Sequence, residues 1–182
     1  MKTMRASREH DDMICDRAIT SVAKGNTDAL SVIYRTYGRM IVSVAYQIVK
    51  NQQDAQDVLQ DVLLCIAKKA AKYKPSTNPR AWVMTITRNL ALNAVKANRT
   101  HASFEELTDC DLVRTAHNFA EEHVILDDAL RTLSDEERLI VKLKTYIGLS
   151  HAEIASVLEI TESNAQKRYE RAIAKLRTYF EE

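Results

Sequence analysis

The chain has 182 residues and carries 26 Lys and Arg against 25 Asp and Glu, with only 3 Gly and 2 Pro. So few helix breakers, and no alternating β-type segments, predict an all-α fold. The length allows one or two small domains, and the division of charge along the chain favours two helical domains joined by a flexible linker. An enzyme is the least expected class, and no cofactor is expected, because the sequence holds no nucleophile–base pair and no phosphate-binding Gly loop. The three thiols are too scattered for a disulfide framework or a zinc site: Cys15, Cys65 and Cys110.

The net charge of +1 conceals a division along the chain. Residues 12–99 hold 13 basic and 6 acidic residues, residues 100–125 hold 1 and 6, and residues 126–182 hold 9 and 11. We expect a loose tail over 1–11, a basic domain over 12–99, an acidic linker over 100–120 and a second domain over 121–182. No apolar run of signal-peptide or membrane length follows the N-terminus, so a soluble cytoplasmic protein without membrane insertion is expected.

The first domain is predicted to hold four helices, over residues 12–24, 27–49, 52–72 and 80–97. Either Asn26 or Thr27 is the expected cap of the second helix. Two prolines and a Ser/Thr/Asn cluster predict a loop over residues 73–80. The second helix carries an apolar stripe at helical spacing, formed by Leu30, Ile33, Tyr34, Tyr37, Ile41, Val44, Ala45 and Ile48.

The third predicted helix has an acidic face, on which Asp54, Asp57 and Asp61 recur at i, i+3 and i+7 with Gln56 and Gln60 beside them. In a basic domain, such a face is a candidate docking surface for a positively charged protein. Alternatively, acids at a helix N-terminus complement the macrodipole, although this explains the third aspartate, two turns into the helix, less well.

The loop and the fourth helix mix aromatic, amide and cationic side chains, which can hold single-stranded nucleic acid by stacking and phosphate contact. Trp82 also fits an apolar stripe with Ile86 and Leu90, so a position in the core is its alternative. The mixture comprises Tyr73, Lys74, Arg80, Trp82, Arg88, Lys96 and Arg99.

The second domain has the pattern of a helix-turn-helix. Ser134 with Glu137, and Ser150 with Glu153, each fit a capping box at a helix start. The second box opens a short helix over 150–158, a turn follows at 159–160, and Thr161 can cap a last helix.

That last helix has two faces. Ala165, Tyr169, Ala172 and Leu176 can pack inward, while a polar stripe points elsewhere. A cationic stripe behind a short helix and tight turn suits a DNA major groove; the alternative is a three-helix bundle with a solvated charged face. The stripe consists of Asn164, Arg168, Arg171 and Lys175.

These segments, in this order, resemble a sigma-70 family RNA polymerase sigma factor of the small extracytoplasmic-function (ECF) type. "DAQDVLQDVLL" (residues 54–64) resembles the polymerase-binding helix of that family, and "NPRAWVMTITRNLALN" (78–93) resembles its promoter-melting helix. Residues 129–177 resemble its −35-binding domain. The resemblance implies a protein that binds core RNA polymerase and promoter DNA, with an anti-sigma factor as an expected partner.

The resemblance also implies roles for residues. The polymerase-binding set is Asp54, Gln56, Asp57, Gln60 and Asp61. The set implied for opening the −10 element and holding a flipped base is Tyr73, Lys74, Arg80, Arg88, Asn89, Asn93 and Lys96. The −35 set is Ser163, Asn164, Gln166, Lys167, Arg168, Arg171 and Lys175.

The chain departs from the family pattern at several positions. Gln56 stands where an acid is common, residues 64–68 lack bulky aromatics, Asn93 replaces a more usual Asp, and residues 94–100 carry only two cations. Ala165-Gln166 replaces a typical Val-Lys. Two other functions remain open: a sigma-like interaction protein that sequesters an anti-sigma factor, and a stand-alone helix-turn-helix regulator.

Overall fold

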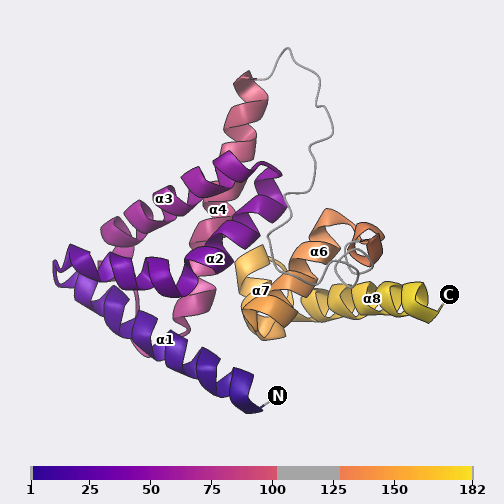
Figure 1. Cartoon of the computed structure of the whole chain (residues 1–182), viewed down its shortest axis with the longest axis horizontal. Helices are drawn as coiled ribbons and strands as arrows, with labels where there is room; N and C mark the ends of the chain where they lie inside the picture. The colour runs from indigo at the N-terminus through magenta and orange to yellow at the C-terminus, as the bar shows by residue number, and fades with distance from the viewer. Residues whose placement is uncertain (1, 102–127, 182) are drawn as a thin grey trace, which may run out of the picture. The chain divides into compact units, whose positions relative to one another are not determined.

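The computed structural model describes residues 2–101 and 128–181, with the side chains of residues 6–97 and 128–181. Every regular element in these two ranges is helical (Figure 1). The chain divides into two compact units, Met1–Ala102 and Ser103–Glu182, which are described separately. None of the described helices is long and apolar enough to cross a membrane.

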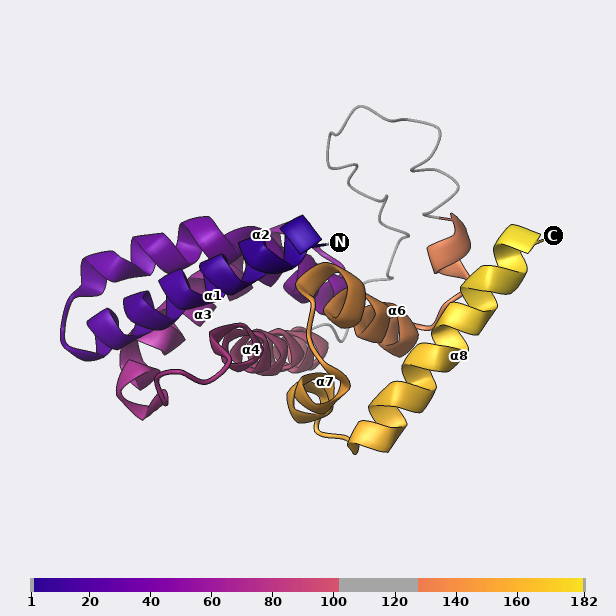
Figure 2. The same ribbon diagram turned by 90° about the horizontal axis from the view of Figure 1, so that it is seen from below.

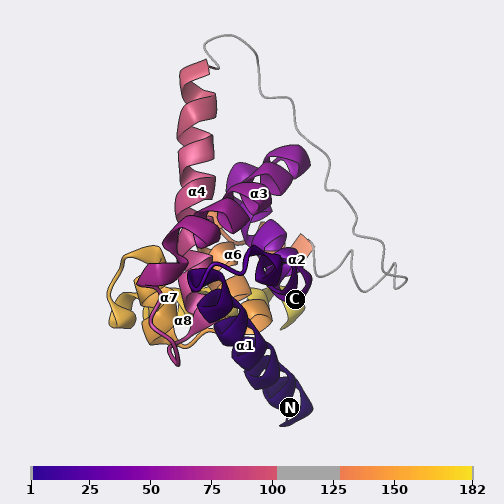
Figure 3. The same cartoon turned by 90° about the vertical axis from the view of Figure 1, so that its left-hand side faces the viewer.

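Unit 1 is a bundle of α1 (Lys2–Ala23), α2 (Leu30–Val49), α3 (Gln52–Lys69) and α4 (Pro79–His101). Two 3-10 turns, Thr27–Ala29 and Ala70–Lys72, precede α2 and follow α3. The helix α2 lies at the centre and contacts the other three. The C-terminal turns of α4 extend beyond α2 and α3 (Figure 3).

The predicted apolar stripe of α2 forms the core of unit 1. Ile33, Tyr37, Ile41 and Val44 are all 0% exposed, and Val58, Val62 and Ile66 of α3 are at most 2% exposed. Tyr34 is the exception, since 54% of this residue is exposed. It lies at the edge of the stripe, with its ring against Gly38.

The structure corrects two expectations in unit 1. Residues 2–11, expected as a loose tail, belong to α1. This part of α1 is held by α4, because Arg80 Nη2 donates a hydrogen bond to the carbonyl oxygen of Arg8 at 3.1 Å. The side chain of Asn26 makes no capping hydrogen bond, and a 3-10 turn begins the second helical segment instead.

Unit 2 contains α6 (Asp135–Val141), a π-helical turn (Lys142–Ile147), α7 (His151–Leu158) and α8 (Glu162–Glu181). Both predicted capping boxes are present, at Ser134 and Ser150. Figure 2 shows the tight turn between α7 and α8, where Glu159 adopts the left-handed conformation with φ 58°. The expected linker over 100–120 lies outside the described residues, except that α4 continues through residue 101.

Candidate protein and nucleic-acid interfaces

The acidic face of α3 is open to solvent. Its first turn is ordered by Asn51, whose Oδ1 accepts from the backbone N of Asp54 at 3.0 Å. Asp54 is half-buried, while the other four predicted docking residues are exposed, namely Gln56, Asp57, Gln60 and Asp61. These exposed side chains are therefore accessible to a partner.

Leu64 extends the same face with an apolar side chain, because it follows Asp57 by seven residues and Asp61 by three. Its exposed fraction is 57%, the largest among the exposed large apolar residues in the described part of the chain. An exposed leucine beside carboxylates is typical of a protein contact, where an apolar centre is rimmed by charge. Sequence reasoning missed Leu64, although its spacing from the aspartates was the signal that could have identified it.

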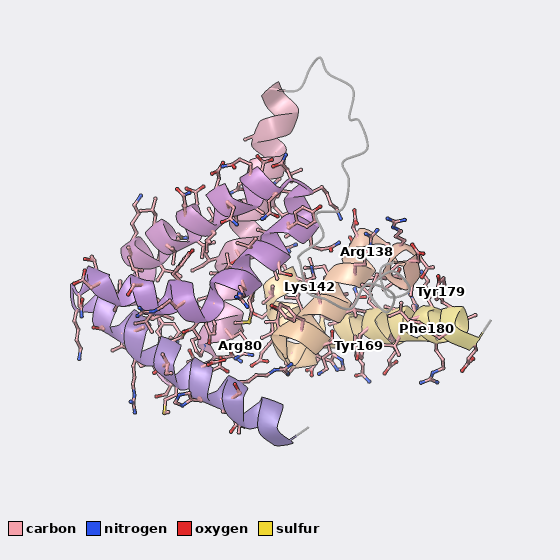
Figure 4. All side chains as sticks on the ribbon, viewed as in Figure 1. Arg80, Arg138, Lys142, Tyr169, Tyr179 and Phe180 are labelled. Carbon is pink, nitrogen blue, oxygen red and sulfur yellow. The ribbon has the colours of Figure 1, made fainter. Side chains whose placement is uncertain are left out.

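Two residues expected to contact DNA near the loop are instead buried. Arg80, which is labelled in Figure 4, is 3% exposed. Its Nε lies 2.9 Å from Asp12 Oδ1 on α1. Its guanidinium carbon also lies 5.6 Å from the ring centroid of Tyr37. A guanidinium paired and stacked in this way is not free to contact a nucleic acid, so Arg80 is a structural residue in this conformation.

Tyr73 is 6% exposed, and its hydroxyl donates to Asp16 Oδ1 at 2.6 Å. Burial, and then this hydrogen bond, raise the pKa of Tyr73 well above its ordinary value. The ring of Tyr73 packs against Trp82, with 5.1 Å between centroids and a 55° tilt. Both aromatic rings therefore belong to the packing around the loop, and Trp82 is half-buried rather than a core residue.

A pocket of about 290 Å³ lies between the C-terminal part of α3 and α4. Its walls combine one aromatic ring with polar and aliphatic side chains: Trp82, Thr85, Ile86, Asn89, Leu90 and Asn93 from α4, and Cys65 and Lys69 from α3. Amide groups beside an aromatic ring can hydrogen-bond to the edge of a nucleobase and stack on its face. Two of the predicted residues, Asn89 and Asn93, thus meet at one cavity.

The remaining cations of the −10 set lie in the loop and on α4. Lys74 is exposed in the loop, and Lys96 is exposed near the end of α4. Arg88 is half-buried on α4. The loop itself ends at Asn78, whose Oδ1 accepts from the backbone N of Ala81 and so caps α4.

On α8, the predicted inward face is buried as expected. Ala165 and Ala172 are 0% exposed, and Tyr169 and Leu176 pack on a core formed with Leu133. Thr161 caps the helix, because its Oγ1 accepts from the backbone N of the residue three positions on, at 3.3 Å.

Two cations of the polar stripe of α8 form ion pairs with glutamates of α6. Arg168 Nη1 lies 2.5 Å from Glu136 Oε2, and Arg168 Nε donates to Asn164 Oδ1 at 3.0 Å. Lys175 Nζ donates to Glu137 Oε1 at 2.7 Å. Three members of the expected −35 set therefore lie along the border with α6.

The other four members are exposed and adjoin this border, because Arg171 follows Arg168 by three residues. Gln166 Nε2 donates to Glu170 Oε1 at 2.8 Å along the same helix. The exposed set consists of Ser163, Gln166, Lys167 and Arg171. These short and cationic side chains, on the first half of a helix that follows a tight turn, match the geometry by which a helix-turn-helix contacts a major groove.

Comparisons with known proteins agree with both units. The family model Sigma-70 region 2 matches residues 33–101, and Sigma-70, region 4 matches residues 123–176, together more than half of the chain. The ECF RNA polymerase sigma factor SigL of Mycobacterium tuberculosis is 25% identical over 174 residues, covering 90% of this chain and 96% of that protein.

Two solved structures share the fold. The first is CnrH in complex with the cytosolic domain of CnrY, with a TM-score of 0.65, 22% identity, and coverage of 94% of this chain and 97% of that chain. The second is the sigma factor RpoE in complex with the anti-sigma factor NepR from Bartonella quintana. Its TM-score is 0.58 at 20% identity, covering 79% of this chain and 91% of that chain.

Proposed function

The chain belongs to the sigma-70 family of RNA polymerase sigma factors, in its ECF class, and from this membership we propose which of its surfaces bind the polymerase and the promoter. It is an alternative sigma factor that binds core RNA polymerase and directs promoter-specific initiation of transcription. This role requires binding and DNA opening rather than a catalytic residue of its own. Because its partner is the transcribing polymerase, the proposed location is the cytoplasm.

The acidic face of α3 is the proposed polymerase-docking surface. Asp57, Gln60 and Asp61 are exposed on it, and Leu64 supplies an exposed apolar centre. Charge complementarity with a basic partner sets orientation and association rate, whereas the leucine contributes buried area. The juxtaposition of these two kinds of side chain is the observation that carries the proposal.

The pocket between α3 and α4 is the proposed site for one unpaired base of the −10 element. Asn89 and Asn93 supply hydrogen-bonding groups and Trp82 supplies an aromatic surface. Extruding a base from the stack costs a few kcal/mol, which contacts of this kind offset. Lys74 and Lys96 are proposed to contact backbone phosphates nearby.

The exposed surface of α8 is the proposed −35 contact. Lys167 and Arg171 are long enough to reach bases or phosphates, and Ser163 and Gln166 lie near the N-terminus of the helix. An anti-sigma factor is a proposed partner, because RpoE of Bartonella quintana, which shares this fold, was solved with one.

The test is reconstitution of the purified full chain with bacterial core RNA polymerase and a library of random promoter sequences. We expect transcripts that begin downstream of a shared pair of −10 and −35 elements. The Asp57→Lys/Asp61→Lys variant, which reverses the docking charge, serves as the control and should yield few transcripts. Absence of any chain-dependent transcript, together with failure to retain the polymerase in a pull-down, would overturn the proposal.

A further inference from the structure

Helix α1 places two carboxylates, Asp12 and Asp16, one turn apart on the side that faces the loop between α3 and α4. Neither lies in the stretch matched by the region 2 family model, which begins at residue 33. Each carboxylate uses a single oxygen to accept two hydrogen bonds from distant parts of the chain. Asp12 Oδ1 accepts from Arg80 Nε, at 2.9 Å, and from the hydroxyl of Tyr37.

Asp16 holds the loop itself. Its Oδ1 accepts from the Tyr73 hydroxyl at 2.6 Å and from the backbone N of Ser76 at 2.9 Å. Ser76 adopts a left-handed conformation with φ 61°. A non-glycine residue keeps such a conformation only where its surroundings hold it there, and the hydrogen bond from its own N–H supplies that constraint.

The contacts of Asp16 continue to the pocket. Tyr73, oriented by Asp16, packs against Trp82 with 5.1 Å between ring centroids, and Trp82 is part of the pocket wall. At the far end of the loop, Asp12 fixes Arg80 at the start of α4. The two ends of the loop are thus bound to α1 by Asp12 and Asp16, which are four residues apart. Asp16 is also connected to the proposed base site, because it contacts Tyr73, which packs against Trp82.

We propose that Asp16 is a positioning residue for promoter opening: it acts through Tyr73 and Ser76 to hold the loop and the Trp82 wall ready to receive an unpaired −10 base. Such preorganisation matters because the cost of ordering a loop during binding is subtracted from the affinity. The proposal rests on the proposed function, since it assigns the pocket to the −10 element.

The experiment uses the full chain with core polymerase, on a promoter selected from the random library and labelled with 2-aminopurine in its −10 element. The fluorescence of 2-aminopurine reports opening directly. Asp16→Ala should reduce opening and transcript yield on the duplex promoter by roughly tenfold, the scale of a lost hydrogen bond to a charged group. Polymerase binding should stay at the wild-type level.

Three comparisons separate positioning from a general loss of structure. Asp16→Asn keeps an accepting oxygen and should restore most of the opening. Asp11→Ala removes the same charge from the same helix without touching Tyr73 or Ser76, and should behave as wild type. On a promoter whose −10 region is mismatched and already open, the loss of transcript yield caused by Asp16→Ala should be smaller, because the cost of opening has been removed.

Tyr73→Phe deletes only one hydroxyl and gives the same test if Asp16→Ala does not fold; it should show a smaller loss of opening. Promoter opening at the wild-type level by Asp16→Ala, or by Tyr73→Phe if Asp16→Ala does not fold, would overturn the proposal. A loss of opening in Asp16→Asn as large as that in Asp16→Ala would also overturn it. These outcomes differ from failure of the proposed function, in which the wild-type chain itself yields no transcript.

Discussion

Lys175 extends from α8 to the carboxylate of Glu137 on α6, with Nζ 2.7 Å from Oε1 and 2.9 Å from Oε2. Glu137 Oε2 also accepts from the backbone N of Ser134, as the second half of the capping box. The carboxylate of Glu137 therefore caps the N-terminus of α6 and also binds α6 to the proposed DNA-contacting helix, α8. These hydrogen bonds, led by that from Lys175, lower the pKa of Glu137 below its ordinary value of 4.5.

The pH dependence follows from the direction of that shift. A carboxylate with a lowered pKa in the folded state stabilises the fold above its ordinary value, and this stabilisation is lost as the pH falls through the lowered pKa. Glu137→Gln keeps a capping side chain but removes the charge, so at pH 7 it should lower the stability of unit 2 by about 0.5–1 kcal/mol. Amide hydrogen exchange in α6 and α8 measures this. The difference in stability between wild type and Glu137→Gln should narrow below pH 4.5. A difference in stability that does not change with pH would contradict the role assigned to the Glu137 carboxylate.

Release of Arg168 from Glu136 should strengthen DNA binding. Glu136→Gln removes the carboxylate that holds the guanidinium at 2.5 Å. We expect affinity for a −35 duplex to rise a few-fold at low salt, with the gain vanishing at high salt because the new contacts are to phosphate. Fluorescence anisotropy measures the affinity. Glu181→Gln, at the C-terminal end of α8 and away from the proposed contact surface, is the control for net charge, and an equal gain in that variant would mean that Arg168 does not reach the DNA.

Arg171 is the proposed base-contacting cation of α8. Arg171→Ala should weaken binding to the −35 duplex by about 1–3 kcal/mol and relax the preference at one base position. Lys175→Ala should have a smaller effect, because Glu137 already holds its ammonium group. A library of −35 variants measures both the affinity and the preference. If Arg171→Ala weakens all sequences equally, the residue contacts phosphate instead.

Arg80 should matter for stability rather than for DNA. Arg80→Ala leaves the carboxylate of Asp12 without its cationic partner, so the free energy of unfolding of unit 1 should fall by on the order of 3 kcal/mol. Urea unfolding followed by the fluorescence of Trp82, the one tryptophan, measures this unit alone. Lys74→Ala, an exposed cation of the same loop, should stay within about 0.5 kcal/mol of wild type. Unchanged stability with a loss of single-strand binding would restore Arg80 as a DNA contact.

Leu64 should contribute to polymerase binding without contributing to folding. Because 57% of this residue is exposed, Leu64→Ser removes little buried area and should leave the unfolding curve unchanged. Its affinity for core polymerase should fall by about 1–2 kcal/mol, as for an apolar anchor in an interface. Met13→Ser removes an exposed apolar side chain from α1 and should bind as wild type. If Leu64→Ser and Met13→Ser bind core polymerase with equal affinity, Leu64 is not part of the docking surface.

The local sequence determined the elements and their caps. The two Ser–Glu pairs at 134 and 150 form capping boxes in the structure, because those hydrogen bonds close within three residues and need no distant partner. The inward face of α8 was predictable for the same reason, since helical periodicity alone places Ala165 and Ala172 together. The presence and order of the helices in both units also followed from periodicity.

Only the tertiary structure decided what the charged and aromatic side chains contact. In the sequence, Arg80 and Tyr73 are a cation and an aromatic residue in a loop. That pattern fits a contact with single-stranded DNA as well as it fits a structural role. Their actual partners are Asp12 and Asp16, 68 and 57 residues away. Arg168 likewise finds its carboxylate 32 residues away. Spacing along a helix specifies which face a side chain occupies, but the charge on the surface packed against that face comes from a different part of the chain.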